Sequence, residues 1–269
     1  MTTMKISATK KIECLKLRPW SYFAKTMLAG FFIDMAMIYS NVVNQIFSGS
    51  VFPELGRFLG ALVFSIAVLL IVLVGGELFT GNNLVMGYGL YTGSVKPSDV
   101  ASVWVVSWFG NLIGCVLMAL IFVLAGASGT APYYATMIAS KLSIPEVQLF
   151  FRAILCNFFV CCGVCCGIRL KSEAGKILMI LMCISGFVIS GFEHSVANMG
   201  NFAVALMLLP AVPFVGIVKN LAIVTIGNIV GGSILLALPL WFSEKGSDHG
   251  ADTADAGDNP VRDRLEDLT

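Results

Sequence analysis

Long apolar segments recur along the chain from Phe23 to Phe242, and each is long enough to cross a lipid bilayer. A membrane-spanning helix needs about 20 mainly apolar residues. The 269 residues are 57% hydrophobic and only 12% charged, so the chain is predicted to be an all-α integral membrane protein with no room for a separate soluble domain. Hydropathy places six spans at Phe23–Val43, Phe58–Leu90, Val103–Leu124, Val147–Ile168, Lys176–Leu209 and Asn220–Phe242.

The second and fifth spans are longer than a bilayer requires, and each carries glycine and polar residues near its middle. These residues are 75–83 in the second span and 190–198 in the fifth. Non-helical backbone at membrane depth is tolerated only where it is buried in protein or lines a wet cavity. We therefore predict that helices two and five are broken at mid-membrane.

Lysine and arginine residues gather in the loops that six spans place on one side of the membrane. The positive-inside rule makes that side cytoplasmic, so both termini are predicted to lie in the cytoplasm beneath the cell membrane. The chain divides into a basic N-terminal segment (1–22), a six-helix membrane domain (23–242) and a disordered acidic tail (243–269). The basic segment lacks the small-residue cleavage site of a signal peptide, and the net charge of +1 argues against a nucleic-acid partner. The basic residues on this side are Lys5, Lys10, Lys11, Lys16, Arg18, Lys25, Lys96, Arg169, Lys171 and Lys176.

The two halves of the chain resemble each other. Glu77 precedes Asn111 by 34 residues (77 to 111), and Glu193 precedes Asn228 by 35 residues (193 to 228). Because each half holds three spans, the second copy must be inverted in the membrane relative to the first. The matching segments are Gly30-Phe31-Phe32-Ile33 with Asn157-Phe158-Phe159-Val160, Gly76-Glu77-Leu78 with Phe192-Glu193-His194, and Gly110-Asn111-Leu112-Ile113-Gly114 with Gly227-Asn228-Ile229-Val230-Gly231.

Inverted repeats place a binding site near the midplane, where the two broken helices meet. The N-termini of the half-helices expose unpaired N–H groups and positive dipole ends at that point. Both features favour a negatively charged ligand, so the pattern predicts a pathway for anions.

Four motifs, in order along the chain, resemble the signatures of the formate/nitrite transporter family. The resemblance covers residues from about 20 to 242. It implies an aquaporin-like fold of six spans, a homopentamer with one pore in each protomer, and passage of small monovalent anions such as formate, nitrite or hydrosulfide. The motifs are Gly76-Glu77-Leu78-Phe79-Thr80-Gly81-Asn82, Leu155-Cys156-Asn157, Gly191-Phe192-Glu193-His194-Ser195-Val196-Ala197-Asn198-Met199 and Ile226-Gly227-Asn228.

The resemblance also assigns roles to individual residues. It puts His194 at the pore centre with Thr80 beside it, and Lys141 at the outer mouth as an anion-attracting residue. Val68 falls in the inner constriction, where a leucine is expected, so that constriction is expected to be wider or closed differently. The residues of the two constrictions are Leu78 and Val68 on the cytoplasmic side, and Phe64, Phe79 and Phe187 on the outer side.

The polar residues of the spans carry different expectations. A histidine at the midplane is costly and functional by default, so His194 is assigned to the pore rather than to a helix–helix hydrogen bond. A permanent carboxylate would repel anions, so Glu77 and Glu193 are expected to be structural and to cap backbone N–H groups freed by the breaks. Asn157 and Asn228 are expected either to bond across helices or to contact the anion, with the second slightly favoured.

The remaining residues predict neither catalysis nor a cofactor. Cys161-Cys162 and Cys165-Cys166 have no nearby histidine or acidic residue, so they are interpreted as packing groups rather than metal ligands. No nucleophile accompanies His194, which argues against an enzyme. An aquaporin-type channel for neutral solutes is the alternative, although Asn-Pro-Ala motifs are absent. Small residues at 110, 114, 227 and 231 suit close helix packing.

Protons are the expected partner of the anion during uptake. An imidazole has an unperturbed pKa near 6.5, so His194 is able to offer a hydrogen bond or a proton to a weak acid between the constrictions. An inside-negative potential of about 100 mV opposes uptake of one anion by about 2.3 kcal/mol. A proton taken up with the anion removes that penalty. Formate is the leading candidate for the anion, with nitrite and hydrosulfide close behind.

Overall fold

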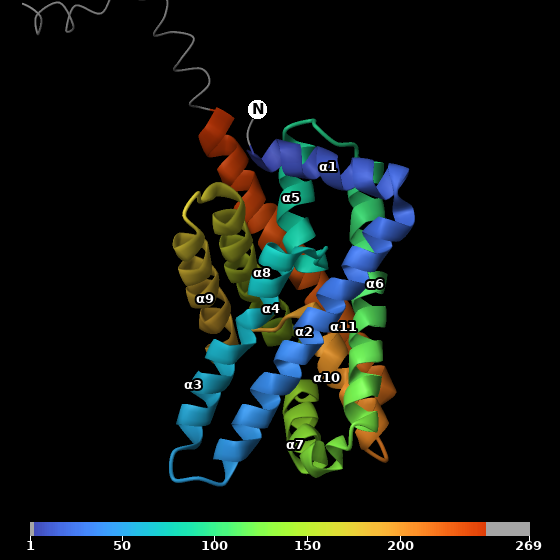
Figure 1. The fold of residues 1–269 in the computed structure, drawn as a ribbon, viewed down its shortest axis with the longest axis vertical. Helices are drawn as coiled ribbons and strands as arrows, with labels where there is room; N and C mark the ends of the chain where they lie inside the picture. Colours follow the sequence, from blue (N-terminus) through green and yellow to red (C-terminus); the bar gives the residue numbers. More distant parts are fainter. Residues whose placement is uncertain (1–2, 246–269) are drawn as a thin grey trace, which may run out of the picture.

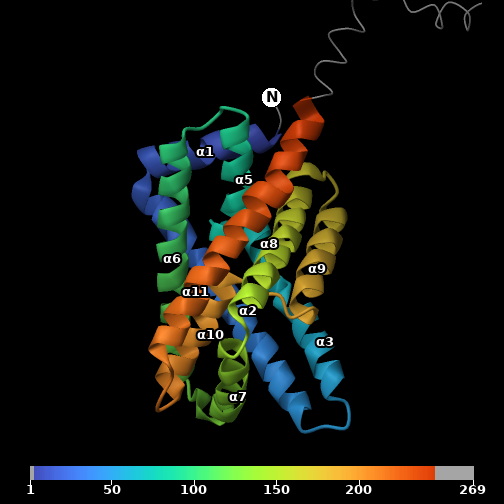
Figure 2. The ribbon, with the colours of Figure 1, turned by 180° about the vertical axis from the view of Figure 1, so that it is seen from behind.

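The computed structural model describes residues 3–245, and every regular element in that range is a helix. The helices form one elongated bundle (Figures 1 and 2). Five helical stretches are long and apolar enough to cross a membrane, which confirms an all-helical membrane protein. They are α2 (Pro19–Ser48), α3 to η1 (Pro53–Gly75), α6 (Pro97–Leu124), α8 (Glu146–Arg169), and the stretch Phe214–Lys245 that comprises α11 (Phe214–Ile229), the π-helical η3 (Val230–Ala237) and its continuation.

The helices extend beyond the spans that hydropathy predicts. Helix α2 begins four residues before Phe23 and ends five residues after Val43. Its backbone hydrogen bonds continue into polar sequence that a hydropathy profile does not count. Residues 243–245 of the predicted tail belong to the last helix, and residues 246–269 lie outside the described part of the chain.

The predicted second span is divided at Gly75. Helices α3 (Pro53–Phe64) and α4 (Ile66–Leu70) lead into the π-helical η1 (Ile71–Gly75), and α5 (Phe79–Tyr91) begins after three intervening residues. Gly75 has φ +107°, a left-handed conformation that glycine adopts without a steric penalty. The helical ladder therefore stops here, and residues 76–78 are extended.

The predicted fifth span is divided in the same way. Helix α9 (Glu173–Ile189) stops before Gly191, which has φ +68°, and α10 (Ser195–Leu208) begins after an extended stretch. The division gives helices of 17 and 14 residues, each short for a full crossing. Both interruptions lie near the middle of the long axis; from them, α5 runs toward one end of the bundle and α10 toward the other (Figure 1).

Two shorter helices mark the two ends of the bundle. Helix α1 (Thr3–Leu17) lies across one end, here called the α1 end, where the helix ending at Lys245 also finishes (Figures 1 and 2). It packs through Met4, Ala8 and Ile12, which recur at the helical spacing of four residues. Helix α7 (Ala131–Leu142), preceded by the 3₁₀ turn η2 (Ala127–Thr130), lies at the opposite end, here called the α7 end.

Glycines set the closest helix contacts. A Cβ added to Gly114 of α6 would lie 2.2 Å from the carbonyl oxygen of Met27 in α2. A Cβ added to Gly231 of η3 would lie 2.2 Å from the carbonyl oxygen of Ile154 in α8. Larger residues would force these helices apart, so the small-residue positions predicted from the sequence do lie at helix contacts.

Candidate functional site at the two helix interruptions

The two interruptions meet at Thr80 and His194. The Oγ1 atom of Thr80 lies 3.0 Å from Nε2 of His194, and the two side chains are 0% and 2% exposed. Thr80 is in the first turn of α5, and His194 is the N-cap of α10. The structure thus brings together the pair that the family resemblance placed at the pore centre.

The ring orientation of His194 follows from its second nitrogen. Nδ1 accepts a hydrogen bond from the backbone N–H of Ala197 at 3.1 Å, so this nitrogen carries no proton in the neutral ring. Nε2 then carries the hydrogen and donates it to the Thr80 hydroxyl. Within residues 3–245 the Thr80 hydroxyl forms no other hydrogen bond, so its own hydrogen is available to a ligand. The site presents a neutral hydrogen-bond donor, the Thr80 hydroxyl, at the positive ends of two half-helices.

Apolar and aromatic side chains surround this polar pair. The ring of Phe187 stacks on His194 with centroids 5.8 Å apart, and Phe64 meets Phe187 edge-on at 6.0 Å. These two phenylalanines and the other predicted constriction residues are all at most 3% exposed and belong to one packed cluster. Electrostatic interactions are stronger in such a water-poor environment than in bulk solvent. The other predicted constriction residues in this cluster are Val68, Leu78 and Phe79.

Two asparagines hold the interruptions in shape. Asn111 of α6 accepts a hydrogen bond from the backbone N–H of Phe79 at 2.9 Å, and its amide donates to the carbonyls of Thr26 (2.7 Å) and Glu77 (3.0 Å). The Phe79 N–H and the Glu77 carbonyl belong to the first interruption, whereas Thr26 lies within α2. The side chain of Asn111 therefore replaces helical hydrogen bonds that the interruption removes and ties the interruption to α2.

Asn228 does the same at the second interruption. It accepts from the backbone N–H of Ser195 at 2.9 Å and donates to the carbonyls of Ala153 (2.8 Å) and Glu193 (3.0 Å). Both amide hydrogens of Asn228 are thus bound to backbone oxygens, which leaves neither for an anion.

Asn157 links the half-helix α5 to the C-terminal end of α11. Its amide donates to the carbonyl oxygens of Thr80 at 3.2 Å and Asn228 at 2.6 Å, and the Cys161 thiol also points to the Thr80 carbonyl at 3.4 Å. Asn157 therefore supports the residue that faces His194 rather than facing the centre with an amide hydrogen of its own.

The two glutamates are paired with lysines. Glu77 accepts a hydrogen bond from Nζ of Lys11 in α1 at 2.6 Å and from the Tyr22 hydroxyl at 3.2 Å. Glu193 accepts from Nζ of Lys141 in α7 at 2.8 and 3.0 Å, and from the amide of Asn198 at 2.7 Å.

This differs from the expectation that the carboxylates cap backbone N–H groups, because Asn111 and Asn228 already satisfy the backbone. Lys141 also differs from the expected anion-attracting lysine at the outer mouth. Glu193 compensates its charge, so Lys141 is half of an ion pair rather than a free cation.

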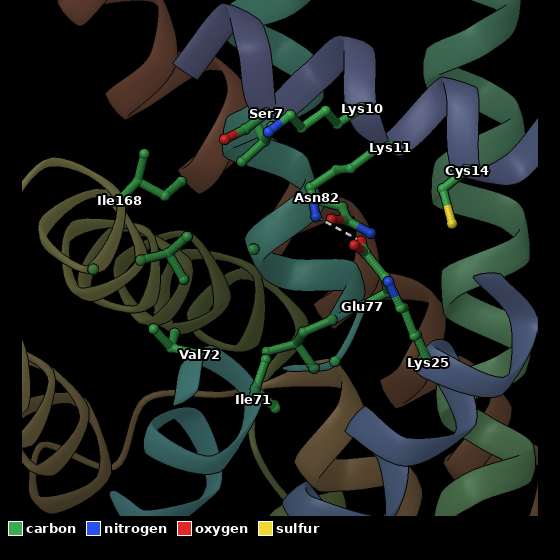
Figure 3. Close-up of a pocket in the computed structure, with 16 residues that line it drawn as sticks. Ser7, Lys10, Lys11, Cys14, Lys25, Ile71, Val72, Glu77, Asn82 and Ile168 are labelled. Atoms are coloured by element: carbon green, nitrogen blue, oxygen red, sulfur yellow. Dashed lines mark hydrogen bonds and ion pairs between the residues drawn. The ribbon is translucent and has the colours of Figure 1, made fainter. Parts of the chain in front are cut away.

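A cavity opens on each side of the centre. At the α1 end, a cavity of about 390 Å³ is lined by Lys10, Lys11, Lys25, Glu77 and Leu78, among others (Figure 3). At the α7 end, a larger cavity of about 1060 Å³ includes Arg57, Lys141 and Val188 in its lining. The buried Thr80–His194 pair belongs to neither cavity lining, and the apolar cluster separates it from both.

Several residues of the site escape prediction from the sequence. The internal repeat identifies Asn111 as the counterpart of Asn228, but only the folded structure shows which backbone groups its side chain binds. Lys11 and Tyr22 carry no local signal, because their contact with Glu77 joins residues 66 and 55 positions apart.

In the described part of the chain, no group of three histidine, cysteine or acidic side chains is arranged to hold a metal ion. The cysteines there are free thiols, five of them in α8 (Cys156, Cys161, Cys162, Cys165 and Cys166).

Asp34 of α2 fits against Gly200 of α10. The Asp34 side chain is fully buried, and a Cβ at Gly200 would lie 2.1 Å from its Oδ1 atom. We expect Gly200→Ala to destabilise the protein by about 1–3 kcal/mol because the methyl group overpacks this contact. Thermal unfolding in detergent measures the loss, and adding Asp34→Ala to the same chain should restore part of it. Equal stability of Gly200→Ala and the unaltered protein would contradict this tight fit.

Apolar membrane-spanning helices, a buried polar pair at their centre and a cavity on either side define a membrane transport protein. A family model described as formate/nitrite transporter matches residues 1–242. The nitrite transporter NirC of Escherichia coli (strain K12) is 31% identical over 231 residues, which cover 84% of this chain and 84% of that protein. The chain therefore belongs to the formate/nitrite transporter family.

Solved structures agree with this assignment. A structure described as an FNT family ion channel has a TM-score of 0.83 and 28% identity, over 89% of this chain and 96% of that chain. A pentameric formate channel with formate bound has a TM-score of 0.73 and 27% identity, over 84% and 97% of the two chains. These relatives are channels and transporters, in keeping with the prediction that the protein is not an enzyme.

Proposed function

We propose that the protein is an anion channel for small monovalent anions of weak acids, with formate as the leading substrate and nitrite and hydrosulfide as alternatives. The observation that carries the proposal is the buried Thr80–His194 pair, in which the Thr80 hydroxyl keeps a neutral hydrogen-bond donor free at the N-termini of two half-helices. The ion pairs of Glu77 and Glu193 remove the repulsion that bare carboxylates would exert on an anion. The relatives named for nitrite and formate support the same class of substrate.

Flux measurements in proteoliposomes test this proposal. Formate, nitrite and hydrosulfide should each pass, whereas lactate and glycerol should pass much more slowly. Rapid glycerol flux without anion flux would favour the aquaporin-type alternative, which none of the matched relatives supports.

The apolar cluster sets the size limit of the proposed pathway. Replacing Leu78 by alanine removes apolar atoms at the wall of the α1-end cavity while Asn111 still fixes the backbone beside it. We expect lactate leakage to rise at least several-fold in this variant and in Phe79→Ala. Stopped-flow uptake of lactate relative to formate gives the ratio. The same ratio in both variants and in the unaltered protein would mean that these side chains do not form the constriction.

A proton accompanies the anion during uptake in this proposal, and His194 couples the two. Protonation at Nδ1 requires the ring to release the N–H of Ala197, since Nδ1 accepts that bond in the neutral ring. The positive end of α10 also disfavours an imidazolium. His194 therefore acts chiefly as a neutral donor through Nε2, and any protonated ring is short-lived.

The proposed architecture is a pair of inverted repeats whose two halves use the same contacts. The backbone N–H of Glu77 donates to the carbonyl of Lys25 at 3.0 Å, and that of Glu193 to the carbonyl of Arg152 at 3.4 Å. The hydrogen bonds of Asn111 and Asn228 correspond in the same way. The distribution of lysine and arginine makes the α1 end cytoplasmic in this proposal.

We expect five protomers to assemble, each with its own pore. Large apolar side chains on the outside of α6, such as Ile121 (60% exposed) and Leu124 (78% exposed), must meet lipid or a neighbouring protomer. The pentameric formate channel supports the number five. Native mass spectrometry in mild detergent should show a pentamer, and a dominant monomer or tetramer would contradict this prediction.

A further inference from the structure

We propose that Lys25, assisted by Lys10, captures anions in the α1-end cavity and so favours passage that starts from the α1 end. This inference rests on the proposed anion-channel function and adds the residues that recruit the anion and a preferred direction. Neither lysine is among the residues that the family resemblance assigned to the pore.

The charges in this cavity do not cancel. Figure 3 shows Lys11 and Lys25 reaching toward Glu77 from opposite sides. Lys11 bonds the carboxylate at 2.6 Å, whereas Lys25 and Lys10 form no ion pair within residues 3–245. Three ammonium groups and one carboxylate therefore line the cavity, which leaves two positive charges uncompensated.

The cavity wall leads to the proposed constriction. Leu78 lines the cavity, and Thr80, the partner of His194, lies two residues further along the chain. The carbonyl of Lys25 accepts the backbone N–H of Glu77, so Lys25 is tied directly to the first interruption. An anion held near Lys25 is thus already at the wall of the pathway.

The α7-end cavity has a weaker excess of charge. Arg57 and Lys141 line it, but Lys141 is bonded to both oxygens of Glu193. One uncompensated cation remains, compared with two at the α1 end. The two mouths should therefore differ in how strongly they concentrate anions.

Coulomb's law gives the size of the effect. One positive charge about 8 Å from an anion in water raises the local anion concentration about twofold. Salt screens this interaction, since the Debye length falls from about 30 Å at 0.01 M to about 3 Å at 1 M. The contribution of Lys25 should be clear at low ionic strength and vanish at high ionic strength.

Formate currents through single channels in planar bilayers test the inference. The orientation is read from a cleavable tag placed after residue 269, and formate is supplied at about 0.02 M from one side at a time. We expect Lys25→Gln to lower the current carried from the α1 side about twofold, and Lys25→Gln with Lys10→Gln about fourfold. The current from the α7 side should stay within about 20% of its original value, and about 1 M of a bulky impermeant salt should abolish the difference.

Two matched variants separate charge from structure. Lys25→Arg keeps the charge and should retain the current, and Lys171→Gln removes an exposed lysine that does not line this cavity. An equal loss from both sides, a loss that persists at high salt, or no loss in Lys25→Gln would overturn the inference. If the unaltered protein carries no formate, nitrite or hydrosulfide current at all, the proposed function itself fails.

Discussion

Replacing Asn228 by alanine should abolish transport, because the backbone of the second interruption loses the side chain that holds it in place. The substitution strands the N–H of Ser195 and the carbonyl of Glu193 at the interruption, and it removes the bond that ties the interruption to the carbonyl of Ala153 in α8. An unsatisfied buried group costs about 1–3 kcal/mol, although hydrogen bonds between membrane helices are worth about 0.6–2 kcal/mol each. The expected loss is about 2–6 kcal/mol per protomer, measured as a lower unfolding temperature and loss of the assembled oligomer in detergent.

Asn44→Ala is the matched control. Asn44 is also an asparagine of a long helix, but its amide bonds only Ser40, within its own helix. Its removal should cost less than about 1 kcal/mol. Asn111→Ala should behave like Asn228→Ala because it strands the N–H of Phe79 and the carbonyl of Glu77, and it removes the bond to the carbonyl of Thr26 in α2. Normal stability of Asn228→Ala would show that water or a rearranged backbone can replace the asparagine.

The sequence predicts the positions of the helices well because the bilayer imposes both length and polarity. The predicted span Val147–Ile168 differs from α8 by one residue at each end. The two interruptions were also predictable, since glycines stand beside polar residues within segments too long for one crossing. Gly75 and Gly191 adopt positive φ at these places.

The contacts between distant segments were not predictable in the same way. Helix α1 was expected only as a basic segment, because its apolar face has just three buried residues, Met4, Ala8 and Ile12. The lysine partners of the two glutamates come from α1 and α7, which hydropathy treats as loops. Which acid a surface lysine pairs with depends on where the whole bundle puts it.

These ion pairs explain how carboxylates persist beside a proposed anion pathway. A buried ion pair is weak evidence for stability, since desolvation offsets most of the attraction. Each pair here affects the electrostatic potential along the proposed pathway, because Lys11 and Lys141 each cancel one negative charge. Breaking a pair while keeping the acid leaves a buried negative charge next to an interruption. In the proposed function, the cations that remain in excess are Lys10 and Lys25 at one end and Arg57 at the other, and they set how strongly each mouth concentrates anions.

Substituting His194 by asparagine should separate anion passage from proton coupling. Asparagine is a good N-cap, so its Oδ1 can take over the bond from the N–H of Ala197 and keep α10 intact. The shorter side chain gives up the Nε2 contact with Thr80 and any chance of protonation. The anion current should therefore persist, because the Thr80 hydroxyl and the helix ends remain.

Acid-driven uptake should lose its pH dependence in the same variant. Where one proton is required, uptake by the unaltered protein should rise by up to about tenfold per pH unit as the outside becomes more acidic. The His194→Asn profile should change less than about twofold between about pH 5 and 8, the range over which the slope of the unaltered protein is measured. Thr80→Ser keeps a hydroxyl opposite the ring and serves as the control that should retain the slope. If His194→Asn keeps the original slope, the proton does not pass through this ring, and His194 serves only to hold α10 and polarise Thr80.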